Sequence, residues 1–255
     1  MKYPISCQLY SARNFWPIEP QLGALKSMGY DAVEPWQAAY EDDPVTFGRQ
    51  IRDAGLDCYG FHMPLAGLIN ETAKYIDIAH ALGAWLMIPP YLAPNERGTT
   101  PDMWRILGDR LGQAAQQVSA HGLKVAWHNH DFEYFPLADG SRPIDHILAA
   151  GGKDLHFEID CGWIMRAGTD PAAELIRYAD RIIAIQVKDT APDGTLKDDG
   201  WTATGDGIID WPRLAPLFSE TNAHHIVTEH DNPSDWKVFA TRSLDYLRSL
   251  PQLRK

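Results

Sequence analysis

The sequence predicts a (β/α)8 barrel, the TIM-barrel fold, and three observations lead to this prediction. Short apolar segments alternate with longer amphipathic segments along the whole chain. Each kind of segment occurs about eight times, the number that a TIM barrel needs. Acidic, imidazole and amide side chains gather where the short segments end. The alternation predicts a parallel sheet, because each return to a parallel strand needs a crossover segment.

The short segments predict strands, since they are rich in aliphatic, β-branched and aromatic residues. In chain order they are ISCQLY (5–10), DAVEPW (31–36), DCYGFH (57–62), AWLMIP (84–89), KVAWHN (124–129), LHFEID (155–160), IIAIQV (182–187) and HIVTEH (225–230). If these strands did not close into a barrel, the same alternation would form a doubly wound open sheet, which is the alternative prediction.

The longer segments predict helices over about 18–28, 43–54, 68–82, 101–121, 142–150, 171–179, 211–221 and 234–249. Several open with a capping residue or a proline, as in TDPAAEL from 169 and DWPRL from 210. Glycines follow the expected helix ends at 29, 55, 83, 122 and 151, where a left-handed cap is typical. No linker-like stretch interrupts the chain, so we expect one domain over residues 1–255.

Composition narrows the class of function. The net charge is −11, with 23 basic residues spread among 34 acidic ones, which argues against a nucleic-acid surface. No stretch is apolar and long enough for a membrane span, and the first residues lack the apolar core of a signal peptide. The three cysteines, Cys7, Cys58 and Cys161, form no CxxC pair. We therefore expect a cytoplasmic protein with reduced thiols that binds neither nucleic acid nor membrane.

Metal-binding side chains are concentrated at the predicted strand ends, most densely in VAWHNHDFEY at 125–134. In a TIM barrel, the active site lies at the carboxyl ends of the strands. Because side chains alternate along a strand, each pair two residues apart shares one face. The pairs are His128 with His130, Glu158 with Asp160, and Gln186 with Lys188. Clustered carboxylates repel one another, so the sequence predicts one divalent cation, with Mn²⁺, Mg²⁺ or Co²⁺ favoured and Zn²⁺ as the alternative.

Seven motifs in order resemble the xylose-isomerase-like TIM barrels, in particular the sugar phosphate isomerase/epimerase group that includes inosose dehydratases and ketose 3-epimerases. They are QLYSAR (8–13), GYDAVE (29–34), HNHDFEY (128–134), FEIDCGWIMRAGTDP (157–171), IIAIQVKD (182–189), GDGIIDW (205–211) and IVTEHDNP (226–233). The resemblance covers nearly the whole chain and implies a sugar-active enzyme on this fold.

The resemblance also implies a ligand set of Glu, Asp, His and Glu from strands 5 to 8. Asp160 and Glu229 match the second and fourth positions. The chain departs at the other two, with His128 in place of the strand-5 Glu and Gln186 in place of the strand-7 His. The expected ligands are Glu133, Asp160, Gln186 and Glu229, and His128 is the substitute if Glu133 points away.

A metal-bound carbonyl acidifies the neighbouring C–H, so the resemblance implies a metal-dependent sugar isomerase or epimerase that works through an enediolate. Glu133 and Glu229 are the expected acid/base pair. His62, His128, His130 and Lys188 are expected to bind substrate oxygens, and Trp16 and Trp163 to form apolar walls. If a β-hydroxyl leaves, the same site is a lyase or dehydratase on a keto-sugar or keto-inositol.

A third alternative is a non-catalytic sugar-binding barrel, which the neutral Gln186 suggests. A DNA-repair nuclease is disfavoured, since the related endonucleases use more histidine ligands and this chain is acidic. A phosphorylated substrate is also disfavoured, because no glycine-rich phosphate loop is present in the sequence. The expected partner is a small sugar or keto-sugar, and relatives of this kind often form homo-oligomers.

Overall fold

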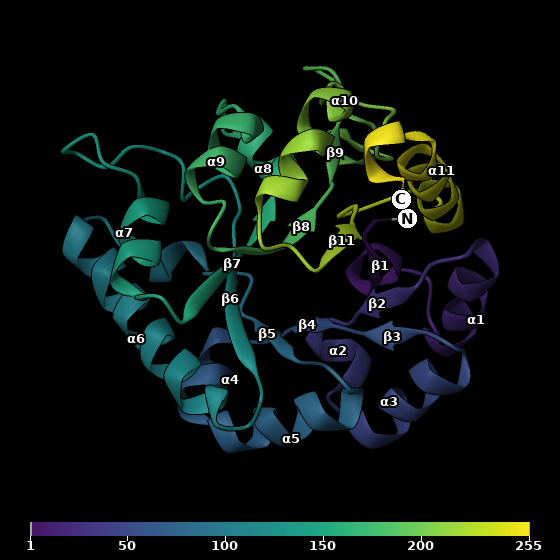
Figure 1. Cartoon of the computed structure of the whole chain (residues 1–255), viewed down its shortest axis with the longest axis horizontal. Coiled ribbons are helices and arrows are strands. Elements are labelled where there is room, and N and C mark those ends of the chain that lie inside the picture. Colours follow the sequence, from purple (N-terminus) through teal and green to yellow (C-terminus); the bar gives the residue numbers. More distant parts are fainter. Residues whose placement is uncertain (1, 255) are drawn as a thin grey trace.

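The computed structural model describes residues 2–254 and shows a parallel barrel surrounded by helices (Figure 1). The sheet order is β3-β2-β1-β11-β8-β7-β6-β5-β4. These strands are β1 Ile5–Gln8, β2 Ala32–Glu34, β3 Asp57–Cys58, β4 Gly60–His62, β5 Leu86–Ile88, β6 Lys124–His128, β7 Leu155–Asp160, β8 Ile182–Gln186 and β11 His225–Thr228. Only Tyr59 separates β3 from β4, the two ends of this order, so the sheet closes on itself. The predicted TIM barrel is confirmed, and the open-sheet alternative is wrong.

The third barrel strand is divided because Tyr59 changes partners. The Tyr59 carbonyl accepts hydrogen bonds from the backbone N–H groups of Trp85 and Leu86, so the ladder passes from β2, which pairs with β3, to β5, which pairs with β4. Glycine at the next position avoids displacing two side chains, since a Cβ on Gly60 would lie 2.9 Å from Glu34 Oε2 and 2.8 Å from Ile88 Cδ1. Gly60 therefore makes room for a carboxylate inside the barrel.

The strand registers place polar side chains beside one another at the carboxyl ends of the strands. His128 pairs with Glu158, and Asp160 pairs with Gln186. Two residues earlier on β6 and β8, Ala126 and Ala184 belong to a small buried apolar cluster. Alternation puts these alanines on the same side as His128 and Gln186, so the polar groups lie above an apolar floor.

The helices surround the barrel on the outside (Figure 1). They are α1 Glu19–Met28, α2 Gln37–Tyr40, α3 Pro44–Asp53, α4 Leu65–Asn70, α5 Thr72–Leu82, α6 Pro101–Ser119, α7 Pro143–Ala150, α8 Cys161–Arg166, α9 Pro171–Arg177, α10 Trp211–Leu214 and α11 Trp236–Ser249. Among residues 2–254, no helix is both long and apolar enough to cross a bilayer.

Two helix predictions need correction. The segment 68–82 forms two helices, α4 and α5, because the helix stops at Asn70 and restarts at Thr72. Gly29, Gly55, Gly83 and Gly122 have positive φ as expected, but Gly151 has φ −63° and the following Gly152 has φ 66°. Gly151 is instead required by close packing, since a Cβ there would lie 2.2 Å from Leu155 Cδ2.

A two-stranded hairpin, β9 Asp189–Thr190 with β10 Trp201–Thr202, extends above the barrel and was not predicted. Asp189 anchors it, because its carboxylate accepts hydrogen bonds from the backbone N–H groups of Thr190, Gly205 and Ile209 and from Trp211 Nε1. The three cysteines are buried and unpaired, as expected.

Candidate active site

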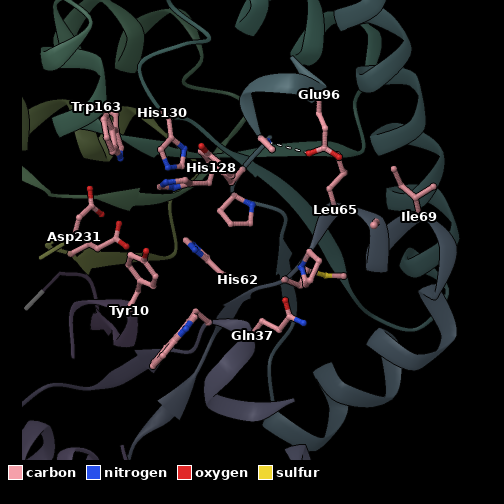
Figure 2. Close-up of a pocket in the computed structure, with 18 of the residues that line it drawn as sticks. Tyr10, Gln37, His62, Leu65, Ile69, Glu96, His128, His130, Trp163 and Asp231 are labelled. Carbon is pink, nitrogen blue, oxygen red and sulfur yellow. Dashed lines mark hydrogen bonds between the residues drawn. The ribbon is translucent and has the colours of Figure 1, made fainter. Parts of the chain in front are cut away.

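A pocket of about 860 Å³ opens at the carboxyl ends of the strands (Figure 2). One end is polar and the other is largely apolar. The lining residues include Tyr10, Trp36, Gln37, His62, Met63, Leu65, Ile69, Pro90, Tyr91, Glu96, Arg110, His128, His130, Trp163, Lys188, Glu229 and Asp231. His62, His128 and His130 lie close together near the middle of the view, whereas Leu65, Ile69 and Glu96 lie at the far side.

Three metal-binding side chains converge at the polar end. One atom each from His128, Asp160 and Glu229 lie within 4.8 Å of one another, and all three side chains are buried. They come from the ends of β6 and β7 and from the residue after β11. Gln186, at the end of β8, completes the arc: one end of its amide lies 2.6 Å from Glu229 Oε2 and 3.1 Å from Asp160 Oδ2.

The other end of the Gln186 amide lies 3.4 Å from Glu34 Oε1 and 3.4 Å from Glu158 Oε2. This amide therefore stands between two pairs of carboxylates, but it has only one donating end. Whichever pair faces the amide oxygen needs a proton or a cation, because acceptors alone repel. The His128 imidazole lies between the two pairs: it groups with Asp160 and Glu229, and its Nδ1 is 3.2 Å from Glu158 Oε2.

Below this cluster, His62 lies between two buried acids. His62 Nε2 is 3.2 Å from Glu34 Oε1 and 3.1 Å from Glu158 Oε2. Burial alone would lower the pKa of His62, but the hydrogen bonds with Glu158 and Glu34 raise it to about 10. Burial and the nearby Glu34 raise the pKa of Glu158 well above its usual range. This lower layer therefore carries its own compensating charge.

Lys188 is the second buried cation of the site. Its Nζ lies 2.7 Å from Asp231 Oδ1, 3.1 Å from Glu229 Oε2 and 3.7 Å from Asp160 Oδ2. Burial alone would lower the pKa of Lys188, but these three carboxylates raise it, so the side chain stays protonated at neutral pH. The ammonium group also lies 5.1 Å from the centroid of the Trp163 ring.

Negative charge still exceeds positive charge in this region. The carboxylates of the two layers are Glu34, Glu158, Asp160, Glu229 and Asp231, and the facing cations are His62 and Lys188. The imidazole of His225 also approaches Glu34, with its Nε2 3.9 Å from Oε2. From the five acids and the two cations alone, three negative charges remain if every acid is ionised. Burial raises the pKa of Asp160 to about 7 and also raises that of Glu229, which is what unbalanced carboxylates undergo without further cations. A divalent cation beside Asp160 and Glu229, together with a proton on Glu158, would cancel the three excess negative charges.

A family model described as the xylose isomerase-like TIM barrel matches residues 22–250. The chain belongs to this family. The inosose dehydratase of Geobacillus kaustophilus is 28% identical over 250 residues, which cover 84% of this chain and 80% of that protein. The inosose dehydratase of Clostridium beijerinckii is 23% identical over 199 residues, which cover 68% of this chain and 66% of that protein. The match to the Clostridium relative thus spans 66% of its length.

Solved structures share the fold. A sugar phosphate isomerase/epimerase from Parabacteroides distasonis superposes with a TM-score of 0.82 at 18% identity, over 100% of this chain and 96% of that one. The IOLI protein, solved with a zinc atom, superposes with a TM-score of 0.73 at 15% identity, over 97% and 96% of the two chains. At these identities the likeness establishes the xylose isomerase-like barrel alone.

Within this family member, the structure brings together most of the residues expected from the sequence. Asp160, Gln186 and Glu229 meet at one point, as the strand alternation indicated. His128 joins them. Both His130 and Trp163 line the pocket, and their ring centroids lie 4.9 Å apart. Their roles in ligation and substrate binding stay predictions.

Glu133 does not join this cluster. Its side chain is buried, with Oε1 accepting a hydrogen bond from Trp127 Nε1 at 3.0 Å and Oε2 accepting one from the His130 backbone N–H at 2.9 Å. Both carboxylate oxygens are thus used to shape the turn after β6. The structure therefore corrects the expected placement: His128, the alternative ligand, takes the position in the cluster, and Glu133 lies apart from Glu229, its expected acid/base partner.

Trp16 is also displaced from its expected place. Its side chain is 57% exposed and packs against Trp36, with ring centroids 5.9 Å apart, and it is Trp36 that lines the pocket. Sequence reasoning missed Trp36, Tyr10 and Tyr91 as pocket residues. Tyr10 and Trp36 are the last residues of predicted strands, and Tyr91 comes two residues after one, so the signal was present but weaker than that of a charged side chain.

Proposed function

We propose that this chain is a divalent-metal-dependent enzyme that removes a proton next to the carbonyl group of a sugar or keto-sugar. The observation that carries the proposal is the convergence of His128, Asp160, Gln186 and Glu229 at the base of the pocket. Two carboxylates, an imidazole and an amide oxygen form a donor set that suits Mn²⁺, Co²⁺, Mg²⁺ or Zn²⁺.

The donor set fits a cation on structural grounds. In one orientation, the Gln186 amide oxygen faces Asp160 and Glu229 while its N–H groups face Glu34 and Glu158, so every amide hydrogen bond below the site is kept. That orientation leaves three facing acceptors, which a cation between them would satisfy. A bound divalent cation would polarise a substrate carbonyl and stabilise the negative charge that develops on its oxygen.

The residues of the chain would handle the proton and the substrate oxygens. Glu229 is the proposed general base, because it is the carboxylate of the cluster that lines the pocket. Lys188 would donate hydrogen bonds to substrate oxygen while holding Glu229 and Asp231 in place. Burial lowers the pKa of His130 to about 3, so His130 would act as a neutral hydrogen-bonding group.

Return of the proton to a neighbouring carbon would make the enzyme an isomerase, and return to the opposite face of the same carbon would make it an epimerase. A second candidate is a dehydratase that expels a β-hydroxyl. It is favoured by the placement of Glu133 outside the pocket, which leaves Glu229 and the protonated Lys188 on one wall. One-sided proton transfer is sufficient for elimination, and the relatives from Geobacillus kaustophilus and Clostridium beijerinckii are named inosose dehydratases.

The test is hydrogen exchange in D2O with Mn²⁺-loaded protein, using an inosose and a ketohexose as probes. Proton NMR should show loss of the C–H signal next to the carbonyl. A new C–H environment without loss of hydroxyl would identify isomerisation or epimerisation, and an ultraviolet band of a conjugated ketone would identify dehydration.

Glu229→Gln should slow the exchange at least about 100-fold, as expected for loss of a general base. The control is Glu71→Gln, which removes an exposed acid at the junction of α4 and α5. Binding of the probes without exchange in the wild-type protein would contradict the enzyme proposal and support a sugar-binding barrel.

A further inference from the structure

The pocket continues beyond the polar cluster into a second compartment. We define the outer compartment by Met63, Leu65, Ile69, Pro90 and Tyr91, all of which line the same pocket as the histidines. Figure 2 shows Leu65 and Ile69 on the side opposite Asp231 and Trp163, with His62 between them. The substrate would therefore reach from the polar cluster toward α4.

The inner part of the outer compartment is lined by apolar side chains. Met63 is buried, and Leu65, Ile69 and Pro90 are half-buried. Polar lining residues on this side, such as Glu96 and Arg110, are exposed at the rim. The Glu96 carboxylate is already used, since it accepts a hydrogen bond from the Ala93 backbone N–H at 3.1 Å.

The apolar wall is held in place by packing behind it. Leu68 of α4 is fully buried, which directs that face of the helix into the core. Gly67 lets α4 approach α5, because a Cβ there would lie 2.2 Å from the ring of Tyr75. Leu65 and Ile69 are four residues apart and share one face of α4, so both are presented to the pocket together.

The size of the pocket also exceeds what a free sugar needs. Its volume of about 860 Å³ lies near the upper end of the roughly 300–1,000 Å³ typical of sites for drug-sized ligands. A free monosaccharide is smaller than such a ligand and carries hydroxyl groups around its ring. It would fill the histidine-lined end and leave the apolar wall exposed to water.

We propose that the outer compartment binds an apolar, preferably aromatic, substituent joined to the sugar, so that the substrate is a substituted keto-sugar, such as a glycoside that carries a ketone on its ring. Simple glycosides, which lack that ketone, serve as binding probes for this compartment. This inference rests on the proposed sugar site at the polar end. Tyr91 marks the passage between the two ends, because its ring centroid lies 5.2 Å from that of His130 while its ring also lines the outer compartment. A flat substituent placed against Tyr91, Leu65 and Ile69 would be removed from water.

The experiment compares matched phenyl and methyl glycosides of glucose, galactose and xylose by isothermal titration calorimetry with Mn²⁺-loaded protein. The phenyl member of at least one pair should bind about tenfold more tightly, as expected for partial burial of an aromatic ring. Ile69→Asp should reduce this ratio to near one, and Ile69→Ser is the milder variant should Ile69→Asp fold poorly. Unchanged affinity for the methyl glycoside shows that either variant keeps its sugar site.

The control is Ile176→Asp, which changes a 64% exposed isoleucine on α9 and should leave the ratio unchanged. Equal affinity for phenyl and methyl glycosides would overturn the inference, as would tighter binding of a disaccharide such as cellobiose or no binding of any pair. The proposed function is tested separately by proton exchange. A phenyl preference without exchange would retain this inference and reject the catalytic proposal.

Discussion

At the scale of single residues, Gln186 is the residue on which the site depends most. It separates the upper carboxylates, Asp160 and Glu229, from the lower pair, Glu34 and Glu158. As a neutral amide it cannot balance charge on both sides at once. The upper pair faces Lys188 and, in our proposal, a metal ion, while the lower pair faces His62.

Replacement of this amide by a better donor should strengthen metal binding. In Gln186→His, an imidazole would face Asp160 and Glu229, and imidazole binds Co²⁺ and Zn²⁺ more strongly than an amide oxygen does. We expect about a tenfold increase in Co²⁺ affinity, measured by competition with a chromophoric chelator. Gln116→His adds a histidine on the exposed face of α6 and should leave the affinity unchanged. An unchanged affinity in Gln186→His would show that this side chain does not ligate.

The positions of single residues were predictable only where a strand fixes them. Asp160 and Gln186 end strands that pair in regular register from Glu158 and Ala184 onward, so alternation and register determine which way they point. Glu133 lies in the turn after β6, and its direction depends on hydrogen bonds to Trp127 and to the His130 backbone, which no periodicity reveals. The same reason explains why the cluster formed by Lys188 and Asp231 could not be foreseen from spacing.

At the scale of elements, the alternation of strands and helices predicted the barrel, but it did not predict its irregular parts. The eight barrel strands were predicted because each is a short apolar run with strand-ending residues on both sides. The division of the third strand at Tyr59 was not predicted, because it depends on which neighbouring strand the Tyr59 backbone bonds to. The β9–β10 hairpin was missed because Asp189 holds it through side-chain contacts rather than by a local pattern.

An ion-pair network joins the helices α7 and α9 and should make stability depend on pH. Asp145 on α7 accepts from Arg142 at 3.1 Å and from Arg177 on α9 at 2.9 Å, and also from the Tyr178 hydroxyl. Burial alone would raise the pKa of Asp145, but the hydrogen bonds from Arg142 and Tyr178 lower it. A carboxyl with a lowered folded-state pKa stabilises the fold above its unfolded pKa and loses that contribution as pH falls through the folded value.

We expect Asp145→Asn to lower the free energy of unfolding by about 1 kcal/mol at pH 7. The difference should shrink below about pH 4, the usual range of an aspartate pKa, as the wild-type carboxyl becomes protonated. Thermal unfolding followed by circular dichroism across this range measures both effects. Asp102→Asn, which breaks an exposed ion pair with Arg105, should change neither the free energy of unfolding nor its dependence on pH. A constant difference at all pH values would contradict the assigned network.

At the scale of the whole molecule, the barrel places charge at one end and apolar packing at the other. Ala126 and Ala184 form part of the apolar floor, and His128 and Gln186 stand above them on the same strands. Closure of the sheet brings distant segments of the chain to the same pocket, from Tyr10 to Asp231. The ends of the chain also meet, since the Lys2 N–H donates to the Leu253 carbonyl at 2.8 Å. Each polar group of the site therefore depends on the complete barrel.

The central claim is that one divalent cation binds between His128, Asp160, Gln186 and Glu229. The most direct test is calorimetric titration of chelator-treated protein with Mn²⁺, with elemental analysis of the product. The wild-type protein should bind one ion per chain. The double variant Asp160→Asn/Glu229→Gln should bind none, while Glu71→Gln/Asp102→Asn, which removes two surface charges, should bind as the wild type does. Absence of binding in the wild type, or full binding in the Asp160 and Glu229 variant, would contradict the account.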